Sequence, residues 1–285
     1  MKELARTFSG KIAGRTLAPT PNCGWPLLLA CAFFAATTLC AQATPEDNAS
    51  LRNRALELCK QGNEAEALPL LQKVAAVRPT DVAVLENLGD ALVKEGRIEE
   101  AKARFMDAIV ADPYQRSSWA GLQEWAKAAR ATIEQPKIEP PASVSAVGDG
   151  KPKTKIDPKS LDKRSGDQVW IAYATVRAQW RSEKFKKEFP NETAYRHTLA
   201  EEVDALQTVA KSVMGARNEK KHWKLDPALL TLVELHNQGL LAPYVLFARA
   251  DEGIAKDYPA YRDAHPDKLR LYLTNWVIST ADSNQ

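Results

Sequence analysis

Residues 82–115 decide the fold, and they read VAVLENLGDALVKEGRIEEAKARFMDAIVADPYQ. Apolar residues recur every three or four positions on both sides of a central glycine, which is the pattern of two amphipathic helices joined by a tight turn. The pattern returns at an offset of 34 residues, where Gly62, Ala67, Leu71 and Pro79 correspond to Gly96, Ala101, Phe105 and Pro113. A period of this length indicates stacked helix pairs, so we expect an all-α fold here.

The repeat resembles the tetratricopeptide repeat family over residues 48–133. The second unit, 82–115, carries the signature residues Leu88, Gly89, Ala101, Phe105, Ala108 and Pro113. The first unit, 48–81, matches more loosely, and the third has only its first helix, at about 116–132, which we expect to cap the array. The resemblance implies a helix-turn-helix array of two full units plus a capping helix, with a surface that binds a protein or a peptide.

The first helix of each unit has one side that would line the concave groove of such an array. Positions 2, 5, 9 and 12 of a unit share that side, because a helix advances about 100° per residue. The groove candidates are Arg52, Leu56, Glu86, Asp90, Val93, Glu124 and Lys127. Leu56 and Asp90 stand where a carboxylate-binding groove of this family has asparagine. We therefore expect an extended peptide or another protein surface as partner, with simply solvated side chains as the alternative.

The first 43 residues have the order of a signal peptide. Basic residues precede an apolar run from Trp25 to Leu39, and the small residues Ala41 and Ala43 follow. We expect cleavage after Ala43 and export to the periplasm or the cell exterior. An N-terminal membrane anchor is the second interpretation, because the run approaches the roughly 17 residues of a short membrane span. A lipoprotein at Cys31 is the third.

Removal of the leader changes the net charge. The leader holds four of the 39 Lys and Arg residues and one of the 36 Asp and Glu residues, which leaves 35 of each in the remaining chain. A formally neutral protein gives no support for a nucleic-acid partner or for attraction to anionic lipid. We expect neither nucleic-acid binding nor stable membrane insertion after cleavage, and a homo-oligomer stays open.

Helical periodicity disappears between residues 134 and 167, where proline, glycine and lysine accumulate. Such a composition disfavours regular backbone, so we predict a Pro/Lys-rich flexible linker that joins a repeat domain, 44–133, to a second domain, 168–285. The helical period returns from residue 168, and its clearest stripe contains Tyr195, Leu199, Val203, Leu206, Ala210 and Val213. We expect a C-terminal bundle of about five helices with no family resemblance.

The second domain offers few residues for chemistry. His197 and Glu201 are four apart on one predicted helix, and we interpret them as a surface ion pair. Beyond the leader we find no phosphate-binding glycine loop, His-Glu-x-x-His or haem-attachment pattern. We predict no catalytic residue, metal or cofactor, and a protein-binding adaptor or scaffold. The alternative is an enzyme or small-ligand-binding domain in residues 168–285, which a cleft joining His197, Glu201 and an aromatic side chain would favour.

Overall fold

The computed structural model describes residues 45–146, 152–156, 166–219 and 224–280, and Ala43–Gln285 form one compact unit. The predicted leader and its cleavage site lie outside the described residues. The described chain is mostly helical, which confirms the all-α prediction, and its strands form two short antiparallel pairs. Among these residues no helix is both long enough and apolar enough to cross a membrane.

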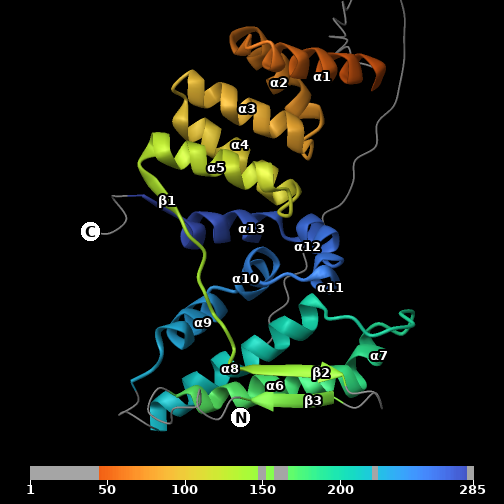
Figure 1. Cartoon of the computed structure of the whole chain (residues 1–285), viewed down its shortest axis with the longest axis vertical. Helices are drawn as coiled ribbons and strands as arrows, with labels where there is room; N and C mark the ends of the chain where they lie inside the picture. The colour runs from red at the N-terminus through yellow and green to blue at the C-terminus, as the bar shows by residue number, and fades with distance from the viewer. Residues whose placement is uncertain (1–44, 147–151, 157–165, 220–223, 281–285) are drawn as a thin grey trace, which may run out of the picture. The chain divides into compact units, whose positions relative to one another are not determined.

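The first half consists of two helix pairs and one further helix, stacked in chain order (Figure 1). This arrangement matches the two repeat units and the capping helix that the sequence predicts. The elements are α1 (Pro45–Lys60), α2 (Glu64–Val77), α3 (Val82–Lys94), α4 (Ile98–Ala111) and α5 (Arg116–Ala129).

Two glycines of the repeat, Gly89 and Gly96, stand where a side chain would not fit or would strain the backbone. Gly96 ends the turn between α3 and α4 with φ +72°, a left-handed conformation that glycine adopts without steric cost. Gly89 lies on α3 against the Phe105 ring of α4, and a Cβ atom at this position would come within 2.7 Å of that ring. The absence of a side chain therefore lets the two helices approach closely around a buried aromatic residue.

The second half contains more and shorter helices than the sequence predicts. Its elements are η2 (Asp167–Val169), α6 (Trp170–Gln179), η3 (Trp180–Lys184), α7 (Phe185–Glu188), α8 (Leu199–Glu219), α9 (Pro227–Asn237), α10 (Leu241–Ala248), α11 (Glu252–Ala255), α12 (Tyr258–Ala264), α13 (Pro266–Tyr272) and η4 (Leu273–Val277). Helices α10 and α11 are separate, because Asp251 caps a new helix by accepting hydrogen bonds from the Gly253 and Ile254 amides. The stripe that contains Tyr195 becomes helical only from Leu199.

The described part of the predicted linker is not a free chain. Strand β2 (Ala142–Ala146) pairs antiparallel with β3 (Pro152–Ile156), and both lie against α6. Ile138 is 1% exposed, and its carbonyl oxygen accepts a hydrogen bond of 2.6 Å from Nη1 of Arg249. The composition argued correctly against a helix. It could not show that one apolar side chain of this segment is buried against the second half.

The two halves are tied together at the end of the repeat array. Strand β1 (Ala131–Ile133), directly after α5, pairs antiparallel with β4 (Ile278–Thr280). The Tyr258 hydroxyl donates to the Val110 carbonyl at 2.7 Å, and Arg262 donates to the Ala111 carbonyl at 3.1 Å. These carbonyls end α4 and have no partner within their own helix. The second half therefore caps α4 and covers the open end of the stack.

Candidate functional site

Two of the predicted groove residues hold the repeats together. Arg52 forms an ion pair with Asp81, the residue that caps α3, at 2.6 Å from Nε to Oδ2. Glu86 accepts hydrogen bonds from the Ser117 and Ser118 hydroxyls at 2.7 and 2.6 Å. Both residues therefore join one unit to the next, and neither is a freely available contact for a partner.

The middle of the groove combines apolar side chains with an acid. Leu56 and Val93 are half-buried and pack against the core. Asp90 is exposed, and its carboxylate has no hydrogen-bond or ion-pair partner among the described residues. Partial desolvation of this carboxyl group, together with the neighbouring Glu86 carboxylate, raises the pKa of Asp90. The Lys94 charge, one helical turn further along α3, opposes this shift only in part. This part of the groove therefore has an exposed acid, without a hydrogen bond or ion pair among the described residues, beside an apolar strip.

Glu124 and Lys127 lie on α5, where they form an exposed ion pair of 2.5 Å with each other. An exposed ion pair contributes little to stability, so a partner that binds Glu124 or Lys127 would break this pair at small cost. The structure thus divides the predicted groove residues into inter-repeat ties, an apolar and acidic centre, and an exposed pair.

A second group of residues, which the sequence analysis did not assemble, lies at the start of α8. Glu201 and Glu202 are both 0% exposed. Glu201 accepts hydrogen bonds from Arg177 Nε at 2.9 Å and from the Tyr195 hydroxyl at 2.8 Å. Burial, followed by the Glu201 charge, raises the pKa of Tyr195 to about 12. Two adjacent buried carboxylates need such partners, because an uncompensated charge in the interior is very costly.

Glu202 is the centre of this group. It accepts hydrogen bonds from the Tyr173 hydroxyl at 2.8 Å, Arg249 Nε at 2.9 Å and His197 Nε2 at 3.1 Å. Burial alone would raise the pKa of Glu202, but the His197 hydrogen bond and the Arg249 and Arg177 charges outweigh it and lower the pKa to about 2. The carboxylate is therefore charged at neutral pH.

His197 differs from the surface imidazole that the sequence predicts. Its Nε2 reaches Glu202 rather than Glu201, and its Nδ1 reaches Asp251 at 2.8 Å. Burial alone would lower the pKa of His197, but the bonds to the two carboxylates raise it above its usual value. Because both ring nitrogens face carboxylates, the geometry favours an imidazolium that donates to both.

A polar cleft of about 550 Å³ opens beside these residues. Its walls come from α6, η3, the segment before α8, and the start of α11. They comprise Arg177, Arg181, Tyr195, Arg196, His197, Asp251, Glu252 and Gly253. Glu201 lies behind the wall and is bonded to Arg177 and Tyr195. The cleft thus joins His197 and an aromatic side chain, but not Glu201 itself, which the second functional hypothesis also required.

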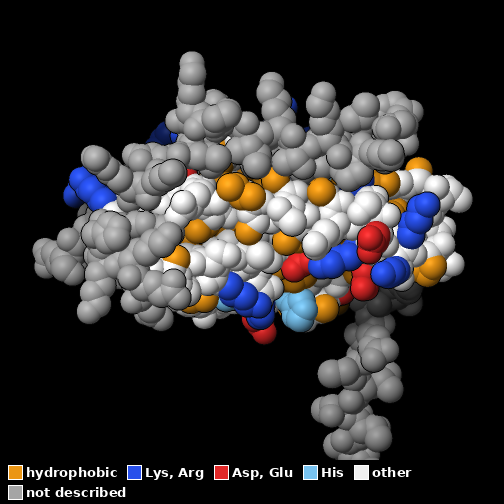
Figure 2. Space-filling model, turned by 90° about the horizontal axis from the view of Figure 1, so that it is seen from below, with side chains coloured by type: hydrophobic (Ala, Val, Ile, Leu, Met, Phe, Trp, Pro, Cys, Tyr) orange, Lys and Arg blue, Asp and Glu red, His pale blue; other side chains and the backbone are white. Residues whose placement is uncertain are grey.

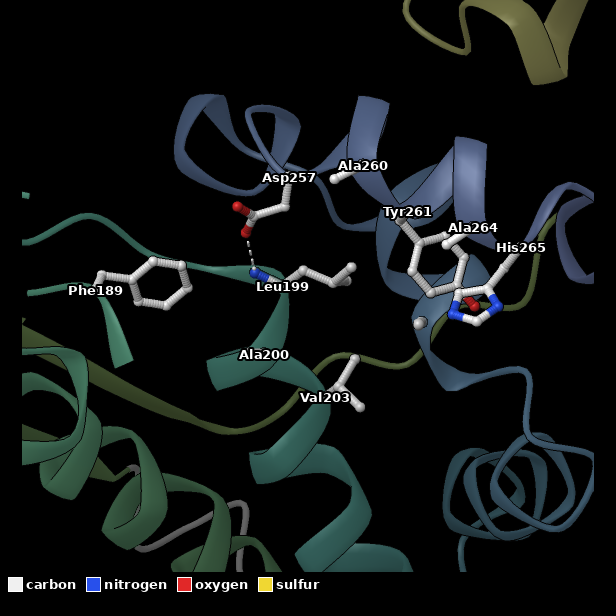
Figure 3. A pocket seen from close by; sticks show the side chains of 10 residues that line it. Phe189, Leu199, Ala200, Val203, Asp257, Ala260, Tyr261, Ala264 and His265 are labelled. Atoms are coloured by element: carbon white, nitrogen blue, oxygen red, sulfur yellow. Dashed lines mark hydrogen bonds between the residues drawn. The ribbon is translucent and has the colours of Figure 1, made fainter. Parts of the chain in front are cut away.

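An apolar pocket of about 400 Å³ lies on the other flank of the segment before α8 (Figure 3). Phe189 faces it from one side, and Tyr261 and His265, with ring centroids 4.8 Å apart, from the other. Leu199 and Val203 form its floor, and the Leu199 amide donates to Asp257 at 2.8 Å. This pocket offers apolar contact and little hydrogen bonding.

The described residues hold no group of three or more His, Cys, Asp or Glu placed to bind a metal ion. On the face seen in Figure 2, several Lys and Arg side chains lie directly beside Asp or Glu side chains and do not form a patch of positive charge. That interleaving gives no basis for a nucleic-acid interface on this face.

Comparison with known proteins identifies one segment. Residues 58–126 match the family model of the tetratricopeptide repeat, so this segment is a repeat of that family. Repeats of this family form protein–protein interaction modules. No significant match was found among curated proteins or among solved structures.

Proposed function

We propose that this chain is an exported adaptor that binds an extended peptide segment of a partner protein through the concave face of α1, α3 and α5. The repeat segment supports the binding class, and the leader-like order of residues 1–43 supports export. The observation that carries the proposal is Asp90, an exposed acid at the centre of the groove that forms no hydrogen bond or ion pair with the described residues and whose pKa is raised by partial desolvation and by Glu86.

The groove chemistry favours a basic and apolar partner segment. Leu56 and Val93 supply half-buried apolar area, while Asp90 and Glu86 lie one helical turn apart and repel each other. A lysine or arginine of the partner would relieve that repulsion, and an acidic residue would increase it. Electrostatic complementarity of this kind sets partner choice more than total affinity.

The test compares three fluorescent peptides with the same apolar residues and with lysine, glutamine or glutamate at the polar positions. Binding to residues 43–285 is measured by fluorescence polarisation. We expect the lysine peptide to bind about tenfold more tightly than the glutamine peptide, a difference of about 1.4 kcal/mol. The glutamate peptide should bind most weakly.

The variant Asp90→Lys should reverse this order. Glu99→Lys makes the same charge change on α4, where Glu99 is exposed and belongs to the second helix of its unit, and it should keep the original order. Equal binding of all three peptides, or an unchanged order in Asp90→Lys, would show that the concave face does not select the partner.

A further inference from the structure

The polar cleft in the second half has an unequal distribution of charge. The basic groups Arg177, Arg181, Arg196 and His197 form part of its lining, whereas the carboxylates that bind two of them, Glu201 and Glu202, are fully buried behind it. Arg177 and His197 are therefore compensated in part from behind the wall, whereas Arg196 is paired with Glu192 and Asp257, and His197 also with Asp251 of the lining itself.

The cationic end of the cleft is built on a widened helical turn. Arg177 and Arg181 are four residues apart on the continuous helix formed by α6 and η3, and η3 is a π-helical turn. Such turns often occur at functional sites, because they re-aim side chains at a cost in backbone regularity. The Arg181 guanidinium lies over the Tyr195 ring, 4.2 Å from its centroid. Among the described residues, Nη2 of Arg177 has no hydrogen-bond partner.

The other end of the cleft is acidic. Asp251 binds His197, and the neighbouring Glu252 is exposed without a partner among the described residues. Tyr195 contacts Arg181 at the cationic end, and His197 contacts Asp251 at the acidic end; the two residues are two apart in sequence. Their Cα atoms therefore lie at most about 7 Å from each other.

We propose that this cleft binds a free α-amino acid, with the carboxylate held by Arg177 and Arg181 and the ammonium group held by Asp251 and Glu252. A cleft lined by arginines at one end and by acids at the other matches a ligand that carries both charges on one carbon atom. A phosphate or a dicarboxylate would meet the same cations, but Asp251 and Glu252 would repel its second negative charge. Arg196 positions the wall, since it donates to Glu192, the Gly253 carbonyl and Asp257.

The test is isothermal titration of residues 43–285 with the protein amino acids, one at a time. The best binder is then compared with its N-acetyl derivative, which lacks the ammonium charge, and its amide, which lacks the carboxylate. We expect saturable one-to-one binding of the amino acid. Each derivative should bind about tenfold or more weakly, because loss of a hydrogen bond to a charged group typically lowers the affinity by at least that factor.

The two ends of the cleft are tested separately by substitution. Arg181→Met keeps contact area over Tyr195 and should weaken the amino acid and its N-acetyl derivative while leaving the amide unaffected. Glu252→Gln should weaken the amino acid and its amide only. Lys186→Met removes an exposed cation of α7 outside the cleft and should change nothing.

Three results would overturn the proposal. They are no measurable binding of any amino acid, equal binding of the amino acid and its N-acetyl derivative, and full affinity in both Arg181→Met and Glu252→Gln. A peptide bound through the repeats would leave this titration unchanged, so the result does not depend on the proposed adaptor function.

Discussion

Replacement of Glu202 by glutamine should destabilise the protein by about 3 kcal/mol. The change keeps the size of the side chain but removes a buried charge that faces Arg177, Arg249 and His197. A pKa near 2 in the folded state, against about 4.3 in an unfolded chain, corresponds to about 3 kcal/mol at neutral pH. Breaking one side of a buried ion pair typically costs about 3–5 kcal/mol, which agrees.

The assay is urea unfolding of residues 43–285 at pH 7, followed by tryptophan fluorescence and circular dichroism. Glu188→Gln removes an exposed carboxylate of α7 and should change the free energy of unfolding by less than about 0.5 kcal/mol. The dependence on urea concentration should stay the same in both variants, because the surface exposed on unfolding is unchanged. A loss below about 1 kcal/mol for Glu202→Gln would refute the view that this carboxylate is charged and compensates its neighbours.

Three further predictions concern stability. Gly89→Ala should destabilise the protein by about 1–3 kcal/mol, because the added Cβ atom would meet the Phe105 ring. Gly215→Ala adds a Cβ atom on an open helical surface, so it should be neutral or stabilise the protein by up to about 1 kcal/mol. Thermal unfolding of both variants makes the comparison. Ile138→Ala should lower the free energy of unfolding by about 2–5 kcal/mol in urea, and no loss would favour the prediction of a free linker. The pKa of His197 is raised in the folded state, so its stabilisation is complete below about pH 6.5 and is lost as pH rises through the folded pKa. His197→Gln should remove that decline from a pH series of unfolding curves, and a parallel decline in both proteins would count against the charged imidazole.

The repeat array could be predicted from the sequence because its contacts are local. Gly89, Phe105 and the turn at Gly96 follow a fixed period, and each makes its contact within one or two neighbouring helices. The groove residues lie on the helices that the sequence predicts, but the sequence did not show which side chains they bind. Whether Arg52 faces a partner or Asp81 depends on two side chains 29 residues apart.

The charged group of the second half could not be predicted in the same way. Glu201 and Glu202 look like ordinary surface acids at the start of a helix, where acids are common. Their burial depends on Arg177 and Arg249, which lie 24 and 47 residues away. The one sequence signal was the concentration of Tyr195, Arg196 and His197 directly before the acids. A helical period assigned to this segment concealed it, since the chain is not helical before Leu199.

The pairing of β1 with β4 affects the order in which this protein can be completed during synthesis. Ile133 pairs with Ile278, so the two strands that close the structure are made about as far apart in time as the second half takes to be translated. Until Ile278 leaves the ribosome, the repeats can fold locally, but β1 has no strand partner, and the end of α4 has no cover until Tyr258 and Arg262 have emerged. A nascent chain should therefore pass through a stage in which the repeats are already formed and their final strand is available to other partners, including helper proteins that bind unpaired strand edges.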